Sequence, residues 1–277
     1  MDGLTQAAVT AHQRARGGLL LSFKRRGDDT VLDRLRQEGC LKARFPHREG
    51  NAWSGAVTLN TAGGVAGGDR LSTVIEAGVG TRATIAAQAA ERIYRALPGD
   101  EAEIVARIEV GEDAALEWLP QETILFDGCA VRRRLDIRLA REASVLAVES
   151  LVFGRTAMGE EVRAARFRDC LTVRREGRLV LHDAIRLVGP VSTVLDRGAV
   201  GRGARAVATI LMAGPEVGGY LDGLREGLAC FEAGASVVDG VLVARIVAPT
   251  GSALRLGVIA GLNILRPGRT LPRVWMC

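Results

Sequence analysis

The stretch RLSTVIEA, residues 70–77, alternates in polarity from one position to the next. Leu71, Thr73 and Ile75 fall on one side of an extended chain, and mostly polar residues fall on the other. This period of two is typical of a β-strand that buries one face. Similar short segments recur at residues 19–23, 40–45, 56–60, 82–87, 103–110, 115–119, 131–139 and 144–153. The pattern therefore predicts a mainly β protein.

Two dipeptides later in the chain predict tight turns. Glu176-Gly177 and Asp239-Gly240 each separate two extended, mainly apolar segments. Asp-Gly readily adopts the positive φ angles of a type I′ turn, and β-branched residues flank the second dipeptide. Both places are therefore expected to form β-hairpins.

Helical periodicity appears mainly toward the C-terminus. Large apolar side chains at i, i+3 or i+4 spacing predict an amphipathic helix over residues 220–231, closed by Gly234. A second apolar stripe predicts a helix over residues 252–265, with Pro267 beyond its end. A short helical turn is expected at residues 30–37. The predicted fold is thus mainly β, with two helices toward the C-terminus.

The composition of the 277 residues is that of an ordinary globular protein, with 48% hydrophobic and 25% charged residues. Arg or Glu interrupts every apolar run before it reaches the roughly 20 residues that a membrane span needs. Residues 1–16 lack the apolar region of a secretion signal, and the five cysteines are isolated, which fits a reducing compartment. We therefore expect a cytoplasmic protein that forms one domain over residues 1–277 and has no membrane partner.

A net charge of +5 and a pI near 9.3 raise the alternative of a basic RNA-binding module. The run Arg132-Arg133-Arg134, however, lies in an alternating segment, where successive side chains point to opposite faces. Stacking aromatic residues, which single-strand binders use, are absent from this neighbourhood. The expectation is therefore no nucleic-acid partner, with RNA binding kept as an alternative.

The most unusual segment contains two Gly-Gly pairs, Gly63-Gly64 and Gly67-Gly68, followed by Asp69 and Arg70. A phosphate-binding P-loop needs Lys and then Ser or Thr after its last Gly, and Asp69 stands where that Lys would be. The following residues alternate like a strand, so no helix N-terminus is available for an anion. The segment is therefore interpreted as a sharp connection whose glycines allow positive φ angles and close packing, with Asp69 capping a turn.

Carboxylates at Glu117, Glu122 and Asp127 raise a second alternative, a carbohydrate-active hydrolase. A pair of carboxylates can act as acid and base, or as nucleophile, across a glycosidic bond. Other catalytic arrangements have less support, because the three histidines are isolated and no Gly-x-Ser-x-Gly elbow surrounds a serine. No His or Cys pair has the close spacing of a structural zinc site. We therefore expect no catalytic residues.

Several segments, taken together and in this order, resemble the urease accessory protein UreD (also called UreH) family. They are Gly63-Gly64, Gly67-Gly68-Asp69-Arg70, Trp118-Leu119-Pro120-Gln121-Glu122, Phe126-Asp127-Gly128, Phe153-Gly154-Arg155 with Gly159-Glu160, and the tail Leu265-Arg266-Pro267, Arg269 and Pro272-Arg273-Val274-Trp275. The matches extend from about residue 40 to the C-terminal region. Residues 88–95 match the family's pattern only loosely.

The resemblance implies a β-helix-like body of stacked strands and a role without catalysis. It also implies three partners: a UreF-like protein, a UreG-like GTPase recruited through it, and the apo-urease subunits. The assembly would load nickel into urease, and this chain would serve as a scaffold and as a conduit for Ni²⁺. No tightly bound cofactor is expected, only transient Ni²⁺. The carboxylates Glu122, Asp127, Glu149 and Glu160 in the matched segments are hypothesised to line the nickel path.

Overall fold

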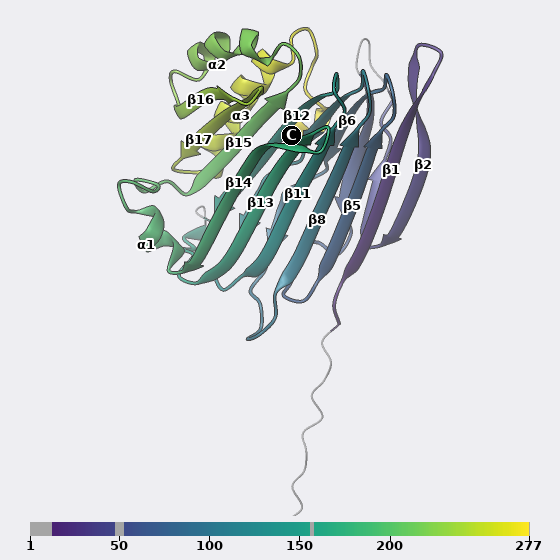
Figure 1. Ribbon diagram of the computed structural model, residues 1–277. Coiled ribbons are helices and arrows are strands. Elements are labelled where there is room, and N and C mark those ends of the chain that lie inside the picture. The colour runs from purple at the N-terminus through teal and green to yellow at the C-terminus, as the bar shows by residue number, and fades with distance from the viewer. Residues whose placement is uncertain (1–12, 48–52, 156–157, 277) are drawn as a thin grey trace, which may run out of the picture.

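The computed structural model describes residues 13–47, 53–155 and 158–276, which form two β-sheets stacked face to face (Figure 1). The first, sheet A, has the order β14 (Arg178–Gly189), β13 (Ala165–Arg175), β11 (Ala130–Leu139), β8 (Ala102–Val110), β5 (Arg70–Ala77), β1 (Arg16–Arg26) and β2 (Asp29–Gly39). The second, sheet B, has the order β16 (Glu232–Val238), β17 (Val241–Ala248), β15 (Ala206–Ala213), β12 (Ser144–Phe153), β9 (Ala115–Leu119), β6 (Arg82–Ala87), β4 (Ser54–Asn60) and β3 (Leu41–Arg44). Two short strands, β7 (Glu91–Ile93) and β10 (Thr123–Leu125), also belong to sheet B, where β10 pairs with both β12 and β7.

From β4 to β13 the chain winds as a β-solenoid, passing alternately from one sheet to the other. Each strand pairs in parallel with its counterpart in the previous turn, so β5, β8, β11 and β13 run side by side in sheet A. In sheet B, β4, β6, β9 and β12 do the same. The stacked-strand body that the family resemblance implied is therefore confirmed.

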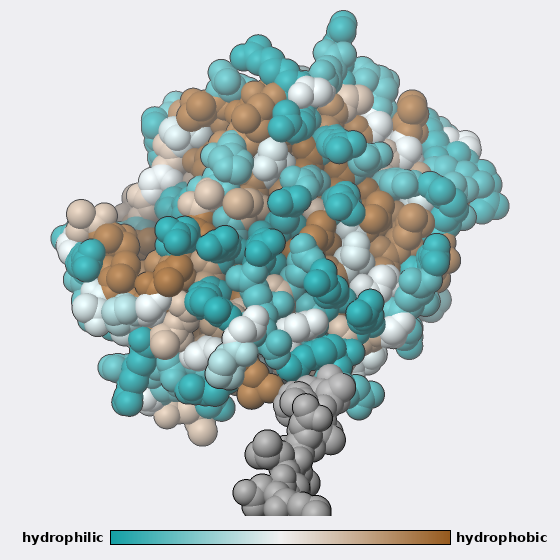
Figure 2. Space-filling model, turned by 60° about the horizontal axis from the view of Figure 1, so that its bottom comes forward, coloured by the Kyte–Doolittle hydropathy of each residue, from teal (hydrophilic) through white to brown (hydrophobic). Residues whose placement is uncertain are grey.

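The two ends of the solenoid differ. At one end the connections are tight, at residues 78–81, 111–114 and 140–143. At the other end three of the four connections are longer, at residues 61–69, 94–101 and 154–164, and the fourth is residues 126–129. We call these four loops the loop end. Figure 2, turned so that the lower part of Figure 1 comes forward, shows a largely hydrophilic surface with separate hydrophobic areas.

Two hydrophobic cores hold these layers together. The first fills the space between the sheets and includes Leu21, Ile75 and Phe167, all of them almost fully buried. The second lies on the outer face of sheet B, which is covered by α2 (Leu221–Gly227) and α3 (Gly251–Leu265). Among the residues that the structure describes, no helix lies on the outer face of sheet A (Figure 1). No helix of the described part is long and apolar enough to cross a membrane.

Most of the predicted elements are confirmed. Strands occupy all nine predicted segments, and both hairpins form, with positive φ at Glu176, Gly177, Asp239 and Gly240. The helix predicted over residues 252–265 is α3, whose N-terminus is capped by the Thr250 hydroxyl, which accepts a hydrogen bond from the backbone N–H of Ala253.

Two helical predictions were wrong in extent or kind. The helix expected over residues 220–231 is α2, which ends at Gly227, and Gly234 lies inside strand β16. Glycines at positions 223 and 227 weaken the helix, and the hairpin draws the residues after 231 into sheet B. Residues 30–37 are strand, not a helical turn, because β2 pairs with β1 along its whole length. A short helix, α1 (Val191–Leu195), was not predicted.

Candidate functional site

Asp69 fixes the Gly-rich segment at the loop end. Its residue is 4% exposed, and its carboxylate accepts hydrogen bonds from the backbone N–H groups of Ala15 (2.7 Å) and Ala66 (2.8 Å). Arg70 starts β5 directly afterwards and pairs with Glu103 on the surface. The segment therefore leads into a strand and offers no helix N-terminus to a phosphate group.

The four glycines of this segment serve different purposes. Gly63, Gly64 and Gly68 have φ angles of 77°, 147° and 88°, a region that favours glycine. A Cβ atom on Gly64 would lie 2.4 Å from Cε2 of Tyr94, and one on Gly67 would lie 2.6 Å from a Cβ atom of the next loop. The segment thus packs its backbone directly against the residues that follow β7.

Asp127 and Glu160 are brought together at the same end. The Asp127 carboxylate accepts the backbone N–H groups of Arg163 (2.8 Å) and Ala164 (2.9 Å) and an Arg95 N–H (2.5 Å). The Glu160 carboxylate lies 3.4 Å from the Asp127 backbone N–H, which donates to it. These contacts join the Phe126-Asp127-Gly128 motif to the 153–160 motif.

Arg155 completes this group. Its Nε donates to Glu160 at 2.8 Å, and its guanidinium carbon lies 4.5 Å from the centre of the Phe126 ring. The hydrogen bond from Arg155 is the main cause of a lowered pKa at Glu160. Burial opposes ionisation of Asp127, but the backbone N–H groups of residues 163 and 164 and the guanidinium of Arg95 lower its pKa overall. Both carboxylates are therefore charged and already paired at neutral pH.

Glycines shape the loop around this group. Gly154 and Gly159 have φ angles of 82° and 68°. A Cβ atom on Gly154 would lie 2.5 Å from the backbone oxygen of Glu160, so only glycine fits there.

A second group of motif residues, which we call the C-terminal clamp, ties the tail to the solenoid. It comprises Glu117, Gln121, Arg255, Arg266, Arg269 and Trp275. Gln121 donates to the backbone oxygen of Val274 at 2.7 Å, and Arg255 donates to the side-chain oxygen of Gln121 at 2.6 Å. The Trp275 indole N–H donates to the backbone oxygen of Leu119 at 3.0 Å.

The centre of the clamp is a buried carboxylate with two guanidinium groups. Glu117 accepts Arg266 Nε at 2.8 Å and Nη2 at 3.0 Å, and the two side chains are 1% and 4% exposed. A nitrogen of Arg269 lies 2.6 Å from the same carboxylate. Glu122, one of the predicted nickel residues, lies beside the clamp, 3.9 Å from Arg255. The Leu-Pro-Gln-Glu motif and the C-terminal signature are therefore joined by the hydrogen bonds and ion pairs of the clamp.

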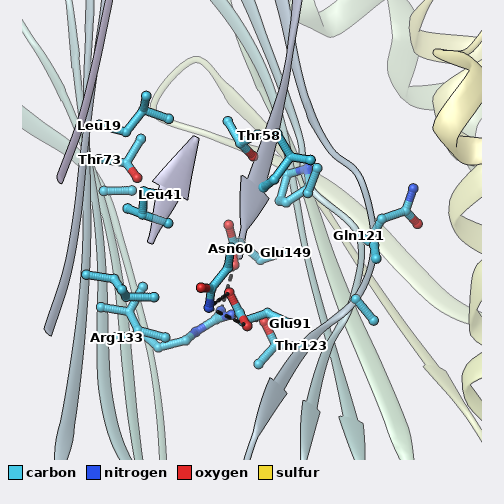
Figure 3. Close-up of a pocket in the computed structure, with 18 of the residues that line it drawn as sticks. Leu19, Leu41, Thr58, Asn60, Thr73, Glu91, Gln121, Thr123, Arg133 and Glu149 are labelled. Carbon is cyan, nitrogen blue, oxygen red and sulfur yellow. Dashed lines mark hydrogen bonds and ion pairs between the residues drawn. The ribbon is translucent and has the colours of Figure 1, made fainter. Parts of the chain in front are cut away.

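Between the sheets, toward the loop end, lies a cavity of about 270 Å³ (Figure 3). Figure 3 shows the side chains of Asn60, Glu91, Arg133 and Glu149 pointing toward one another inside it. Asn60 donates to both oxygens of Glu91 at 3.2 Å. The predicted site residues Gly63, Gly64, Trp118, Pro120 and Gln121 also line the wall.

Arg133 bridges the two sheets within this cavity. From β11 it donates to Glu149 on β12 at 2.6 Å and to Asp169 on β13 at 2.7 Å. It also donates to the Thr123 hydroxyl at 2.5 Å, and Trp118 Nε1 donates to Glu149 at 2.9 Å. Glu149 and Asp169 also line a second, smaller cavity of about 20 Å³, on whose wall Asp183 lies. The ion-paired group therefore stands where the two spaces meet.

Burial and neighbouring charges both shift the pKa values of these groups. Burial disfavours the charged form of Arg133, but the carboxylates of Asp169 and Glu149 outweigh it and raise the Arg133 pKa. Burial raises the pKa of Glu149, and the neighbouring Asp169 charge adds to this, because two carboxyl groups share one guanidinium. Burial also raises the pKa of Glu91, against the hydrogen bond from Asn60.

The four carboxylates hypothesised to line a nickel path are thus at three places. Glu149 is in the cavity, Asp127 and Glu160 lie together at the loop end, and Glu122 lies by the clamp. Within the described ranges, no group of three or more His, Cys, Asp or Glu side chains is arranged to hold a metal ion.

Sequence reasoning missed four polar residues that pair inside the cavity, namely Asn60, Glu91, Arg133 and Asp169. A signal was present for two of them. Arg133 and Asp169 occupy inward positions of alternating strands, between apolar residues, where an ionisable side chain is costly unless it is paired. Which residues pair with them depends on strands far apart in sequence.

Replacing Gly64 by Ala is expected to lower the free energy of unfolding by about 2–6 kcal/mol. The positive φ angle costs about 1–3 kcal/mol, and the collision with Tyr94 adds about 1–3 kcal/mol. Urea unfolding followed by circular dichroism measures the change. Gly63→Ala is the control, because its φ is also positive but no atom lies within 4 Å of the added Cβ. Equal losses in the two variants would contradict the close packing.

Replacing Glu117 by Gln is expected to destabilise the protein by about 3–5 kcal/mol, because it leaves buried guanidinium charge without its carboxylate. The measurement is thermal unfolding together with proteolysis of the tail. Glu109→Gln is the control. It removes a pair 3.5 Å apart in which both side chains are more than half exposed, so a loss below about 1 kcal/mol is expected. A tail as protease-resistant as the unmodified one would refute the clamp.

Comparison with known proteins agrees with these shared motifs. A model of the family described as UreD urease accessory protein matches residues 15–276. The urease accessory protein UreD of Rhizobium leguminosarum bv. viciae is 44% identical over 271 residues, which cover 98% of each chain. That of Methylobacterium sp. (strain 4-46) is 45% identical over 256 residues, 90% of each chain. The chain therefore belongs to the UreD urease accessory protein family.

Proposed function

We propose that this protein is a non-catalytic, cytoplasmic scaffold in urease maturation and that nickel passes through its interior on the way to urease. In this role it bridges the apo-urease subunits and a UreF-like protein, which in turn recruits a UreG-like GTPase. The observation that carries the proposal is the polar cavity between the sheets of a chain whose family consists of urease accessory proteins.

The cavity has the chemistry that a passing cation requires. Glu91, Glu149 and Asp169 place carboxyl groups in an interior where a bare charge would otherwise be strongly disfavoured. Arg133 neutralises two of them, so an arriving Ni²⁺ has to compete with a guanidinium for their oxygens. Nickel also prefers nitrogen ligands to carboxylate alone, which favours weak, transient binding.

The remaining hypothesised path residues lie outside the cavity but on the same part of the molecule. The cavity wall includes Gly63, Gly64 and Gln121, and these residues belong to the loop end or adjoin Glu122. We therefore place Asp127, Glu160 and Glu122 on the proposed path outside the cavity, and Glu149 on the part of the path inside it.

The hydrolase alternative needs one carboxyl group to serve as a general acid. Asp127 does not suit that role, because its pKa is lowered and both of its oxygens are engaged. Family membership favours the maturation role over hydrolysis and over RNA binding alike.

Ala87→Phe tests the passage by filling the cavity without removing a charge, since Ala87 lines its wall. The urease subunits and the UreF-like and UreG-like partners are co-expressed with the variant, and nickel content and urease activity are measured. Blocking the passage is expected to slow nickel transfer by about tenfold or more, which corresponds to a barrier raised by about 1.4 kcal/mol or more.

The control for this experiment is Ala233→Phe on the exposed strand β16. It adds the same atoms at the surface and should leave nickel content unchanged. Deleting the gene should abolish activation altogether. Full nickel loading with a folded Ala87→Phe variant would exclude the interior route, and full activity without the gene would exclude the maturation role.

A second variant replaces Glu122, Asp127, Glu149 and Glu160 by amides. If these groups form the path, nickel content should fall by about tenfold or more, as it does when metal-site partners are removed. Circular dichroism confirms that the variant is folded. Unchanged nickel transfer would remove these four residues from the path.

A further inference from the structure

Three arginines stand in one row across the outer face of sheet A. Arg132 on β11 is in register with Arg168 on β13, which is in register with Arg186 on β14. All three are exposed, and no helix of the described residues covers this face, which is turned toward the viewer in Figure 1. Like charges on directly opposite residues destabilise a sheet. The row is therefore unfavourable for the isolated chain.

No carboxylate on the outward face of β13 or β14 offsets the row. The outward residues of β13 are Arg166, Arg168, Cys170, Thr172 and Arg174, and those of β14 are Leu179, His182, Ala184, Arg186 and Val188. The acids of the same strands point inward, where Asp169 pairs with Arg133 and Asp183 pairs with Arg245.

The ion pairs of the described chain confirm this imbalance. Arg132 pairs with Glu101 at 2.7 Å, but no ion pair is found for Arg134, Arg168 or Arg186 among the residues that the structure describes. Elsewhere on the same face the sheet balances its charges. Arg70 on β5 faces Glu103 on β8 at 2.8 Å, in register. On β11 the outward face also carries Asp136, and Arg138 pairs with Glu109, so the excess of positive charge is concentrated on β13, β14 and the neighbouring Arg134.

Protection of the sheet edge accounts for only part of this pattern. Charged side chains on an edge strand do discourage unwanted pairing with other chains. The same edge strand, however, exposes Leu179 and Val188, at 45% and 51%. Arginine beside exposed apolar side chains is the composition of a protein interface.

We propose that Arg132, Arg134, Arg168, Arg186 and Val188, here called the basic face, dock a protein partner that presents a carboxylate-rich surface. Guanidinium groups suit this role because they bind carboxylates through two parallel hydrogen bonds and are weakly hydrated. A nucleic acid fits less well, because the outward side chains of these strands include no Phe, Tyr or Trp, the large rings on which single-strand binders stack bases.

The first test uses poly-L-glutamate as a carboxylate probe and polyuridylate as a nucleic-acid probe. Binding of the full chain is measured at low and high salt. Poly-L-glutamate is expected to bind at low salt. The variant Arg168→Glu/Arg186→Glu should weaken its affinity by about tenfold or more, which corresponds to the loss of roughly one strong contact or several weak ones. Arg26→Glu/Arg36→Glu is the control, because it changes the net charge equally at the other edge of sheet A.

A neutral variant separates binding from folding. Arg168→Gln/Arg186→Gln removes the like-charge contact, so it should unfold at the same urea concentration as the unmodified chain or a higher one, and still bind poly-L-glutamate more weakly. Lower stability would mean that the row supports the fold and would overturn the proposal. Tighter binding of polyuridylate than of poly-L-glutamate, lost with the same variants, would assign the face to nucleic acid and also overturn it.

The last arm rests on the proposed function for its choice of partners. Purified apo-urease, UreF-like and UreG-like proteins are each tested against the two charge-reversal variants. One of the three should lose about tenfold or more in affinity with the basic-face variant only. If all three bind both variants alike, the docking proposal fails while the maturation role stands. If gene deletion leaves urease active but poly-L-glutamate binding still depends on the basic face, the maturation role fails while the docking proposal stands.

Discussion

Strand register is the constraint on which this structure depends. Each turn of the solenoid adds one strand to each sheet in parallel and in step with the last, so inward positions line up across β5, β8, β11 and β13. Because side chains alternate with a period of two, a slip of one residue would exchange the buried and exposed faces of a strand. Leu135 and Ile137 would then face water, and Arg132 would enter the core.

The same register creates the cavity. Arg133 and Asp169 occupy inward positions on neighbouring strands of sheet A, and Glu149 faces them from sheet B. A buried charge that loses its partner is strongly destabilising, so each of these three groups requires the others. The interior is therefore polar at one place and apolar elsewhere, which confines any passage for an ion to a defined route.

The sequence allows much of this to be predicted, and the failures have physical causes. Alternation in segments such as residues 70–77 gives the strands, and the dipeptides at 176–177 and 239–240 give the hairpins. The segment at residues 30–37 was misread, because its charged residues suit a solvated edge strand as well as a helical turn. The pairing of Arg133 with Glu149 and Asp169, and of Glu117 with Arg266, joins strands and loops that periodicity alone does not place together. Family resemblance found many of the site residues but not what they contact.

The C-terminal clamp bears on how the chain is made. Arg255, Arg266 and Trp275 bind Gln121, Glu117 and the Leu119 backbone, which lie 134 to 156 residues earlier. During translation, the early turns of the solenoid leave the ribosome long before Arg255, Arg266 and Trp275 do. Glu117 therefore lacks its guanidinium partners until residues 266–269 have been synthesised. The outer face of sheet B is meanwhile uncovered, which makes the nascent chain a natural client for general chaperones during the last stage of translation.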